Sequence, residues 1–341
     1  MMSRFRTSPL GVFCTKLTEL ARDGKLDPVV GRDAQTERVI QILGKRNQMN
    51  PCLVGKPGVG KTAVVERLAQ RIIRHDVPET MRRKEVMSLR LDVPVAGTEQ
   101  MGDLKRSLAA LIKEINSRDD IILFIDEVHT LIRRPKAASN ILNLALARGE
   151  LPCIGATTFA GYRKHVMEHW ALEKRFQIVH VPELTVEETI LMFKGLKFRY
   201  EKHHQVHYTD DSLIAAARLS MYITDRFLPD KAISVMDAAG TSVRLRHLQQ
   251  SNEVGELDHE LEGTVRRNDT SENLTLETPV ALLEENERFP EECKVRKHLD
   301  LPEVTVTDIQ RVVSERTGIP VETSNMLSPP EKLRVRVHEE D

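Results

Sequence analysis

The eight residues Gly55-Lys56-Pro57-Gly58-Val59-Gly60-Lys61-Thr62 fit the pattern G-x-x-x-x-G-K-[ST] at every fixed position. The glycines let the backbone curl so that its N–H groups point at phosphate oxygens. Lys61 would reach the β and γ phosphates of a nucleotide, and the Thr62 hydroxyl would hold Mg²⁺. We therefore predict a phosphate-binding loop, the P-loop, whose contacts come from Gly55, Pro57, Gly58, Val59, Gly60, Lys61 and Thr62.

The segments on either side of the P-loop support this interpretation. Residues 51–54 form a short apolar run of strand type, and residues 62–73 carry apolar side chains at helical spacing. Strand, loop and helix in this order bring the phosphates to the N-terminus of a helix, where backbone donors and the helix dipole favour anions. The alternative is a glycine turn without a ligand, which would not require these flanks.

Length and composition fit a globular protein but do not choose among enzymes. The chain has 341 residues, enough for two domains, and 40% of them are hydrophobic. Its net charge of -1 gives no argument for binding nucleic acid, and no run of 18 apolar residues predicts membrane insertion. Four cysteines lie far apart, and we expect those in apolar runs to be buried free thiols.

A second chemical signal follows the run Ile121–Ile125. Five consecutive apolar residues predict a strand buried on both faces, as in a parallel sheet covered by helices. Asp126 and Glu127 come where this strand would end, the position at which open α/β sheets bind ligands. Asp126 would hold Mg²⁺, and Glu127 would accept a proton from the attacking water or orient it. A merely capped strand is the alternative.

A third strand of this type is predicted at residues 153–156, followed by Thr157 and Thr158. A polar residue at this strand end can contact the γ phosphate, although this signal is weak by itself. Strands and helices alternate to about residue 180, which predicts an α/β fold with a parallel sheet and crossover helices.

Five segments in this order carry a family resemblance: residues 27–32, the P-loop, Asp126-Glu127, residues 154–158 and residues 227–233. Together they resemble the first AAA+ module of Clp-type ATP-dependent unfoldases, in particular the ClpC branch of plastids, cyanobacteria and many bacteria. The resemblance is dense over 17–247 and returns over 303–321. It implies an AAA+ P-loop NTPase fold, with helices on both faces of the sheet and a small helical lid domain.

The resemblance also implies roles that spacing does not show. Val29 and Val30 would pack against adenine, and Pro229 in the lid would face the nucleotide. Thr158 would be the γ-phosphate sensor. Arg175 would reach the site of a neighbouring subunit, because these modules act as six-membered rings. The implied catalytic set is Glu127, Lys61, Arg175 and Thr158, with ATP and Mg²⁺ bound.

The resemblance divides the chain into five parts. We expect an N-terminal extension at 1–16, a large α/β domain at 17–182, a helical lid at 183–247, a degenerate middle-domain insertion at 248–302, and the end of the lid with a linker at 303–341. In the insertion, Leu257, Leu261 and Val265 have helical spacing, while Pro279 and Pro290 limit helix length. A second AAA+ module is expected to be absent.

Departures from the family fall where an unfoldase grips its substrate. Where Clp-type modules carry an aromatic pore loop, this chain has Gln100, which offers no rigid apolar surface. The second pore loop is replaced by a shorter segment around residues 133–136. Lys174 stands where the family has the first of two arginines, and lysine lacks the planar fork that clamps phosphate oxygens.

The sequence therefore predicts an ATP-binding, slowly hydrolysing module of a Clp-type chaperone in protein quality control. It would assemble as a homo- or hetero-oligomeric ring, and the altered pore loops leave its protein substrates open. The alternative is a non-catalytic, nucleotide-binding regulatory subunit in mixed rings with full-length Clp ATPases. A decaying duplicate is a third possibility. The plant-type resemblance points to the plastid stroma, and otherwise the chain would be cytoplasmic.

Overall fold

A computed structural model of the protein describes residues 8–45, 49–90, 101–133, 144–148, 151–268 and 301–320. The chain divides into two compact units. Unit 1 comprises Met1–Gly195 and Asp225–Lys231, and unit 2 comprises Leu196–Thr224 and Ala232–Asp341.

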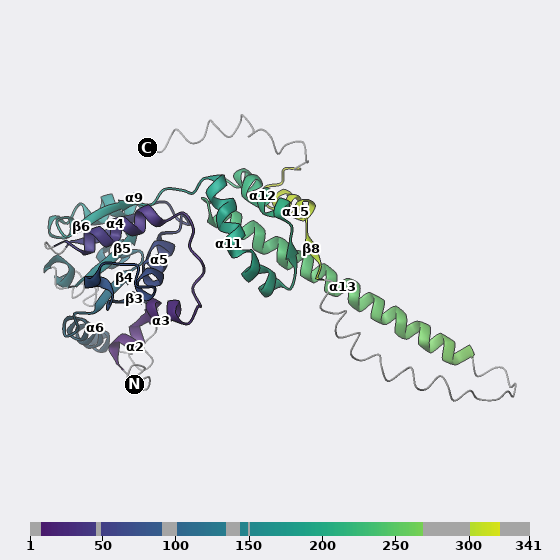
Figure 1. The fold of residues 1–341 in the computed structure, drawn as a ribbon, viewed down its shortest axis with the longest axis horizontal. Helices are drawn as coiled ribbons and strands as arrows, with labels where there is room; N and C mark the ends of the chain where they lie inside the picture. The colour runs from purple at the N-terminus through teal and green to yellow at the C-terminus, as the bar shows by residue number, and fades with distance from the viewer. Residues whose placement is uncertain are drawn as a thin grey trace. The chain divides into compact units, whose positions relative to one another are not determined.

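Unit 1 is built on a six-stranded sheet (Figure 1). Its strand order is β1-β3-β4-β5-β2-β6, and every neighbouring pair is parallel except β1 with β3. Parallel neighbours need crossover connections, which helices supply here. The predicted α/β fold with a parallel sheet is therefore confirmed. The strands are β1 (Cys14–Lys16), β2 (Asn50–Val54), β3 (Glu85–Leu89), β4 (Ile121–Ile125), β5 (Cys153–Thr157) and β6 (Phe176–His180).

The helices of unit 1 pack on both faces of this sheet. Residues 144–148 are also helical. The other helical elements are α2 (Pro9–Phe13), α3 (Leu17–Arg22), α4 (Asp33–Leu43), α5 (Lys61–Ile73), η1 (Glu79–Met81), α6 (Met101–Asn116), α7 (Val128–Arg133), α9 (Phe159–Gly161), η2 (Tyr162–Val166) and α10 (Trp170–Glu173).

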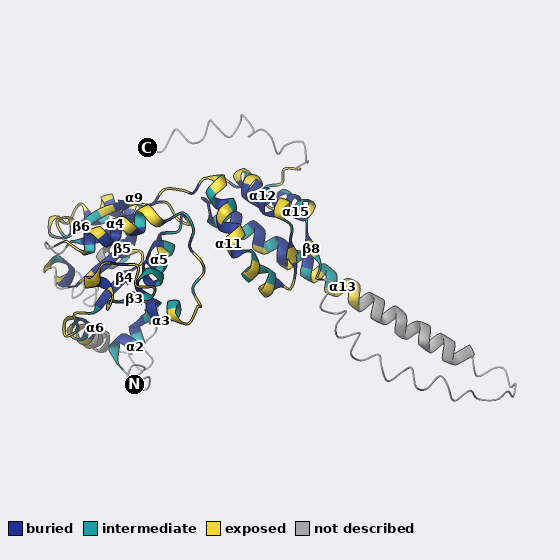
Figure 2. Ribbon diagram, viewed as in Figure 1, coloured by how far each residue is buried: buried dark blue, intermediate teal, exposed yellow. Residues whose placement is uncertain are grey.

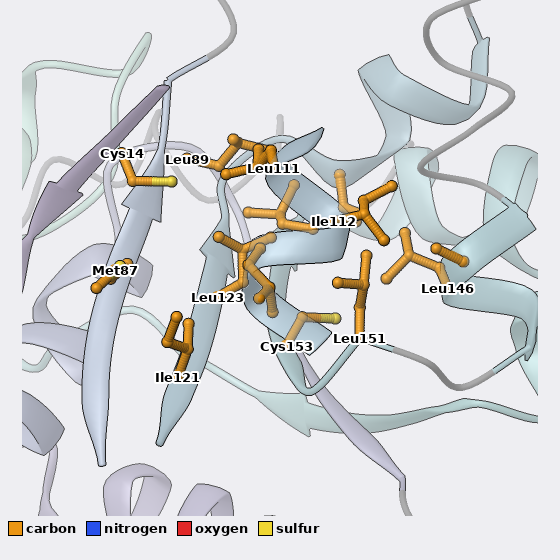
Figure 3. Close-up of a cluster of buried hydrophobic side chains, with 14 of the residues drawn as sticks. Cys14, Met87, Leu89, Leu111, Ile112, Ile121, Leu123, Leu146, Leu151 and Cys153 are labelled. Atoms are coloured by element: carbon orange, nitrogen blue, oxygen red, sulfur yellow. The ribbon is translucent and has the colours of Figure 1, made fainter. Parts of the chain in front are cut away.

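The alternation of side chains along each strand creates two separate cores. In β4, Leu123 contributes to a cluster with Leu111 of α6, whereas Phe124 contributes to a cluster with Leu68 of α5. The strands and the inner helix faces are accordingly buried (Figure 2). Figure 3 shows the first cluster, in which Leu123 and Leu111 are labelled. Each fully buried aliphatic side chain stabilises the fold by about 1.5–3 kcal/mol, so both clusters stabilise the arrangement of the central strands.

The N-terminal segment adds an antiparallel edge strand that the sequence did not predict. In β1, Cys14 pairs with Leu89 and Lys16 with Met87 of β3. Leu10 of α2 is completely buried in the first core. The part of the chain expected to be an extension thus contributes to the sheet.

The cysteines of the described residues fit the expectation of buried free thiols. Cys14, Cys52 and Cys153 are all buried and unbridged. Burial raises the pKa of the Cys14 thiol to about 12, and it also raises the pKa of Cys52 and Cys153. These thiols therefore pack as small apolar groups.

Unit 2 is mainly helical. A two-stranded parallel pair joins β7 to β8, with Tyr208 opposite Val304. Thr305 and Asp308 form a reciprocal capping box at the start of the last helix. Asp308 also accepts hydrogen bonds from Arg246 at 2.6 Å and Arg311 at 3.1 Å. The elements are α11 (Val186–His204), β7 (His207–Tyr208), α12 (Asp210–Leu219), η3 (Ser220–Tyr222), α13 (Asp230–Asn268), β8 (Glu303–Val304) and α15 (Val306–Thr317); α11 and α13 begin in unit 1.

Several predictions concern segments beyond the described residues. Helix α13 continues to Asn268, through the positions predicted to have helical spacing, but 269–300 lie outside the description. The same holds for Gln100, for residues 134–136 and for the linker beyond residue 320. The pore-loop interpretation and the predicted domain boundaries therefore stay predictions. Within the described part of the chain, no helix is both long and apolar enough to cross a membrane.

Candidate nucleotide-binding site

Three strand ends meet at the carboxyl side of the sheet. Strand β5 lies between β4 and β2 and runs parallel to both. The P-loop after β2, Asp126-Glu127 after β4 and Thr157-Thr158 at the end of β5 consequently lie at the same side. A backbone hydrogen bond from Gly55 N to Thr157 O, at 3.2 Å, joins the first and third of these segments.

The P-loop has the backbone shape that a phosphate cradle requires. Gly58 and Gly60 have φ values of 76° and 88°, in the left-handed region that favours glycine. A Cβ atom at Gly55 would overlap the carbonyl oxygen of Val181. The backbone of Val181, just after β6, therefore lies directly against the start of the loop and leaves no room for a side chain at Gly55.

Lys61 is the first residue of α5 and points back over the loop. Its Nζ donates to the carbonyl oxygens of Gly55 at 3.1 Å and Lys56 at 3.0 Å. Only 7% of the residue is exposed. Burial lowers the pKa of Lys61, and the charges of Glu127 and Asp126 oppose that shift. An ammonium group has three donors, so this lysine can bind an anion while the loop carbonyls position it.

The two carboxylates after β4 lie close enough to Lys61 for their negative charges to act on its ammonium group. Asp126 Oδ1 accepts a hydrogen bond from Glu127 N at 2.9 Å, and both residues are exposed. Glu127 has a φ of 48°, an unusual value for a residue other than glycine and one found at functional sites. Thr62, the second residue of α5, is also exposed. A hydroxyl and a carboxylate are the hard oxygen ligands that suit Mg²⁺.

Thr158 lies at the end of β5, as the sequence indicated. It is the N-cap of α9, where its Oγ1 accepts a hydrogen bond from Gly161 N at 3.0 Å. The hydroxyl hydrogen of Thr158 is not used by this bond. The preceding Thr157 is fully buried and contacts His129 instead.

The segment predicted to contact adenine is fixed by α5. Arg67 Nη1 donates to Val29 O at 3.2 Å, and the Gln70 side chain donates to Asp27 O at 2.7 Å. Val29 is buried and Val30 is partly buried. The backbone of the segment that contains the two valines is thus held against α5, the helix that follows the P-loop.

Pro229 belongs to the short segment Asp225–Lys231, which is part of unit 1. Leu228 precedes it through a cis peptide bond and donates its N–H to Glu183 Oε1 at 2.7 Å. A Cβ atom on Gly58 would lie 2.7 Å from Asp230 Cβ. The segment that contains Pro229 therefore lies directly against the P-loop.

Arg175 lies at the opposite, amino side of the sheet. It precedes β6, and its carbonyl accepts a hydrogen bond from Asn50 N, at the start of β2, at 2.8 Å. Its guanidinium donates to the carbonyls of Ala147 and Arg148, both at 3.2 Å. A five-residue strand of about 3.3 Å per residue separates the two sides. The structure brings Lys61, Asp126, Glu127 and Thr158 together, and it places Arg175 apart from them.

Sequence reasoning missed two residues of this site. Arg32 is 3% exposed, and its Nη2 donates to Val59 O at 2.6 Å and to Pro182 O at 2.9 Å. Burial lowers its pKa, and the charge of Glu188 opposes this. His129 contacts both Glu127 and Thr157. The available signals were that Arg32 follows a glycine and that His129 comes shortly after the carboxylate pair. Neither pattern indicates which group the side chain would contact.

Comparison with known proteins agrees with the fold. Residues 51–178 match the ATPase family associated with various cellular activities (AAA), and residues 185–286 match the AAA lid domain. The chain belongs to the AAA+ ATPases.

Within this class the chain is a ClpC-like member of the Clp-type chaperones, which confirms the family predicted from the sequence. It is 50% identical to the chloroplastic chaperone protein ClpC1 of Oryza sativa subsp. japonica over 96% of this chain and 38% of that protein. It is 49% identical to the chloroplastic ClpC of Pisum sativum over 99% of this chain and 40% of that protein. The chain thus spans about two fifths of these relatives.

Solved structures show the same fold. A closed-state reconstruction of Hsp104 with ATPγS and FITC casein matches with a TM-score of 0.71 and 34% identity, over 96% of this chain and 48% of that one. The Saccharomyces cerevisiae Hsp104–ADP complex matches with the same TM-score and identity, over 95% and 48%.

Proposed function

We propose that this chain is an ATP-binding and ATP-hydrolysing AAA+ module of a Clp-type chaperone that acts in protein quality control. The observation that carries the proposal is the convergence of Lys61, Asp126 and Glu127 at one side of the sheet. Burial lowers the pKa of Lys61, and the charges of Glu127 and Asp126 oppose that shift, so the three groups share one electrostatic site. Membership of the AAA+ ATPases supports nucleotide hydrolysis as the reaction.

In the proposed reaction, water attacks the γ phosphorus in line with the oxygen that bridges it to the β phosphate, and that P–O bond breaks as ADP leaves. Different residues would act on different parts of this step. Lys61 and the P-loop N–H groups bind the phosphates and stabilise the charge that develops on them. Glu127 orients the attacking water and accepts its proton. Thr62 and Asp126 would hold Mg²⁺, which neutralises charge between the β and γ phosphates when bound. Val29, Val30 and Pro229 would position the base, and Thr158 would contact the γ phosphate.

Arg175 would complete the site of a neighbouring subunit in a ring. Its position at the amino side of the strands excludes it from the site of its own chain, which supports a role in trans. We therefore propose that hydrolysis requires assembly, with copies of this chain or with full-length Clp ATPases. The relatives at about 50% identity are described as chloroplastic, which supports a plastid location.

The test is steady-state ATP hydrolysis by the purified chain over a range of protein concentrations, beside Glu127→Gln. We expect specific activity to rise with concentration and to vanish in the variant, while the variant still binds ATP. Equal background hydrolysis by both proteins at every concentration would contradict an ATPase.

A second candidate is a non-catalytic regulatory subunit that joins mixed rings with full-length Clp ATPases. The contacts of the Arg175 guanidinium favour it, since they are made to carbonyls of the same chain. In addition, Lys174 Nζ lies 3.8 Å from the centroid of the Trp170 ring. Under this alternative the chain would change the ATPase rate of a full-length ClpC-type partner when mixed with it, even when it carries Glu127→Gln.

A further inference from the structure

His129 is a side chain at the nucleotide site that the proposed mechanism does not use. It lies in the first turn of α7, two residues after Glu127. Its Nδ1 atom is 3.1 Å from Glu127 Oε2 and 2.9 Å from Thr157 Oγ1. A single nitrogen therefore faces both the carboxylate after β4 and the buried hydroxyl at the end of β5.

One ring nitrogen cannot serve both partners in the same way. If Nδ1 carries the proton, it donates to the Glu127 carboxylate and fixes that group beside the helix. If Nδ1 is the acceptor, it takes a hydrogen bond from the Thr157 hydroxyl, and its lone pair then repels the carboxylate. The two arrangements differ by one proton position and one hydroxyl rotation, and only the first restrains Glu127.

The surroundings hold the imidazole at this position. The ring of His165 stacks on it with centroids 5.9 Å apart and planes at 15°. A Cβ atom on Gly161 would lie 3.0 Å from the ring and 2.6 Å from Thr157 Oγ1. Val128, which begins α7, is fully buried. The imidazole is thus enclosed on several sides, while 49% of the Glu127 side chain is exposed.

We propose that His129 is a positioning residue that sets the orientation of Glu127 and couples it to the end of β5. Thr157 precedes Thr158, the residue proposed to contact the γ phosphate. A change at the end of β5 would alter which partner the Nδ1 atom of His129 takes, and with it the freedom of Glu127. The inference rests on the proposed ATPase function and adds a residue to it.

The kinetic test compares three substitutions of His129. Asparagine places a polar atom close to the position of Nδ1, glutamine places it close to that of Nε2, and phenylalanine keeps only the ring. We expect His129→Phe and His129→Gln to lower kcat about 10- to 100-fold, as mispositioned catalytic groups do. We expect KM for ATP to stay within about twofold, since P-loop contacts are retained.

His129→Asn should recover most of the lost kcat, because it restores the contact at Nδ1. If His129 had a purely structural role, the kcat values of the three variants would instead follow their thermal midpoints. These midpoints are measured in parallel. Wild-type kcat in His129→Phe, or equal loss in the Asn and Gln variants, would overturn the proposal while leaving ATP hydrolysis by the wild type intact.

A second readout does not depend on turnover. In nucleotide-free protein labelled with [¹⁵N]histidine, the Nδ1 resonance of His129 should shift in Glu127→Gln and in Thr157→Val. The resonance is assigned by its loss in His129→Asn. If neither substitution moves it, the pairing is absent and the proposal fails, even if the protein hydrolyses ATP. If both move it and the wild type shows no turnover, the proposed function fails and the pairing stands.

Discussion

The two ends of the parallel strands in unit 1 carry different parts of the proposed nucleotide chemistry. At the carboxyl end, the P-loop, Asp126 and Glu127 are assembled by strands buried on both faces. At the amino end, Arg175 and Lys174 lie on a surface with the exposed Trp170, and their contacts are to their own chain. In the proposed mechanism, the groups that bind the nucleotide lie within one subunit, whereas the Arg175 cation would come from a neighbouring subunit.

The largest effect should come from breaking the carboxyl end at Lys61. Lys61→Ala removes a buried charged donor from the phosphate site, and losses of this kind cost roughly 2–5 kcal/mol. We expect ATP affinity to fall at least about 30-fold by equilibrium titration with a fluorescent ATP analogue. Near-normal affinity would show that the P-loop backbone alone accounts for binding.

A smaller effect is expected from Arg175→Ala at the amino end. The substitution removes donors to two backbone carbonyls of residues 147 and 148, and we expect it to destabilise unit 1 by about 1–3 kcal/mol. Lys174→Ala is the matched control and should cost less than about 1 kcal/mol, the size of an exposed cation–π contact.

Thermal midpoints measure the stability of the two variants, and dilution series of ATPase activity measure assembly. Equal midpoints would mean that the carbonyl contacts of Arg175 contribute little. In that case the guanidinium could leave these carbonyls at little cost to reach a neighbour, as the proposed role in trans requires.

A change in unit 2 should leave both strand ends unaffected and have a moderate effect on stability. Burial raises the pKa of Asp308, but hydrogen bonds from Arg246 and Thr305 outweigh it, so the pKa lies below its ordinary value. The contribution of Asp308 is therefore complete above its unfolded pKa of about 3.9 and is lost as the pH falls through the lower folded value.

Asp308→Asn should cost about 1 kcal/mol at pH 7, a shift of a few degrees in the thermal midpoint. The difference from wild type should vanish at the acid end of a pH series. ATP affinity should stay unchanged, and a loss of affinity would mean that unit 2 shapes the nucleotide site.

The smallest effect is expected from Lys56→Ala, within the P-loop itself. Lys56 occupies a free position of the motif, and its Nζ lies 4.4 Å from the centroid of the Phe227 ring. Since its side chain is exposed, we expect ATP affinity to change less than about threefold, the equivalent of a weak cation–π contact. A loss comparable with that of Lys61→Ala would show that Lys56 also contacts phosphate.

The central strands and the P-loop were predictable because burial on both faces leaves a continuous apolar run. Strands predicted at 51–54, 121–125 and 153–156 correspond to β2, β4 and β5. The three-residue strand β1 is too short to give such a pattern, and its antiparallel pairing depends on β3, which lies far away in the sequence.

The candidate site was predictable only as far as single motifs reach. Lys61, Asp126 and Glu127 follow strands and could be inferred one by one. The proposed role of His129 depends on β5 lying next to β4, and strand order cannot be read from apolar runs. Arg32 likewise contacts Val59, which is 27 positions away in the sequence, and Pro182, which is 150 positions away. Tertiary neighbours, rather than local preference, determine both.

The buried guanidinium of Arg32 has a consequence for the speed of nucleotide entry. It joins the P-loop carbonyl of Val59 to the carbonyl of Pro182 through donors that require no nucleotide. Because these hydrogen bonds hold the loop without a nucleotide, we expect no slow ordering step before it captures a phosphate. ATP should therefore associate in a single phase whose rate rises linearly with ATP concentration. In Arg32→Met, the observed association rate should instead level off at high ATP concentration, at the rate at which the loop becomes ordered.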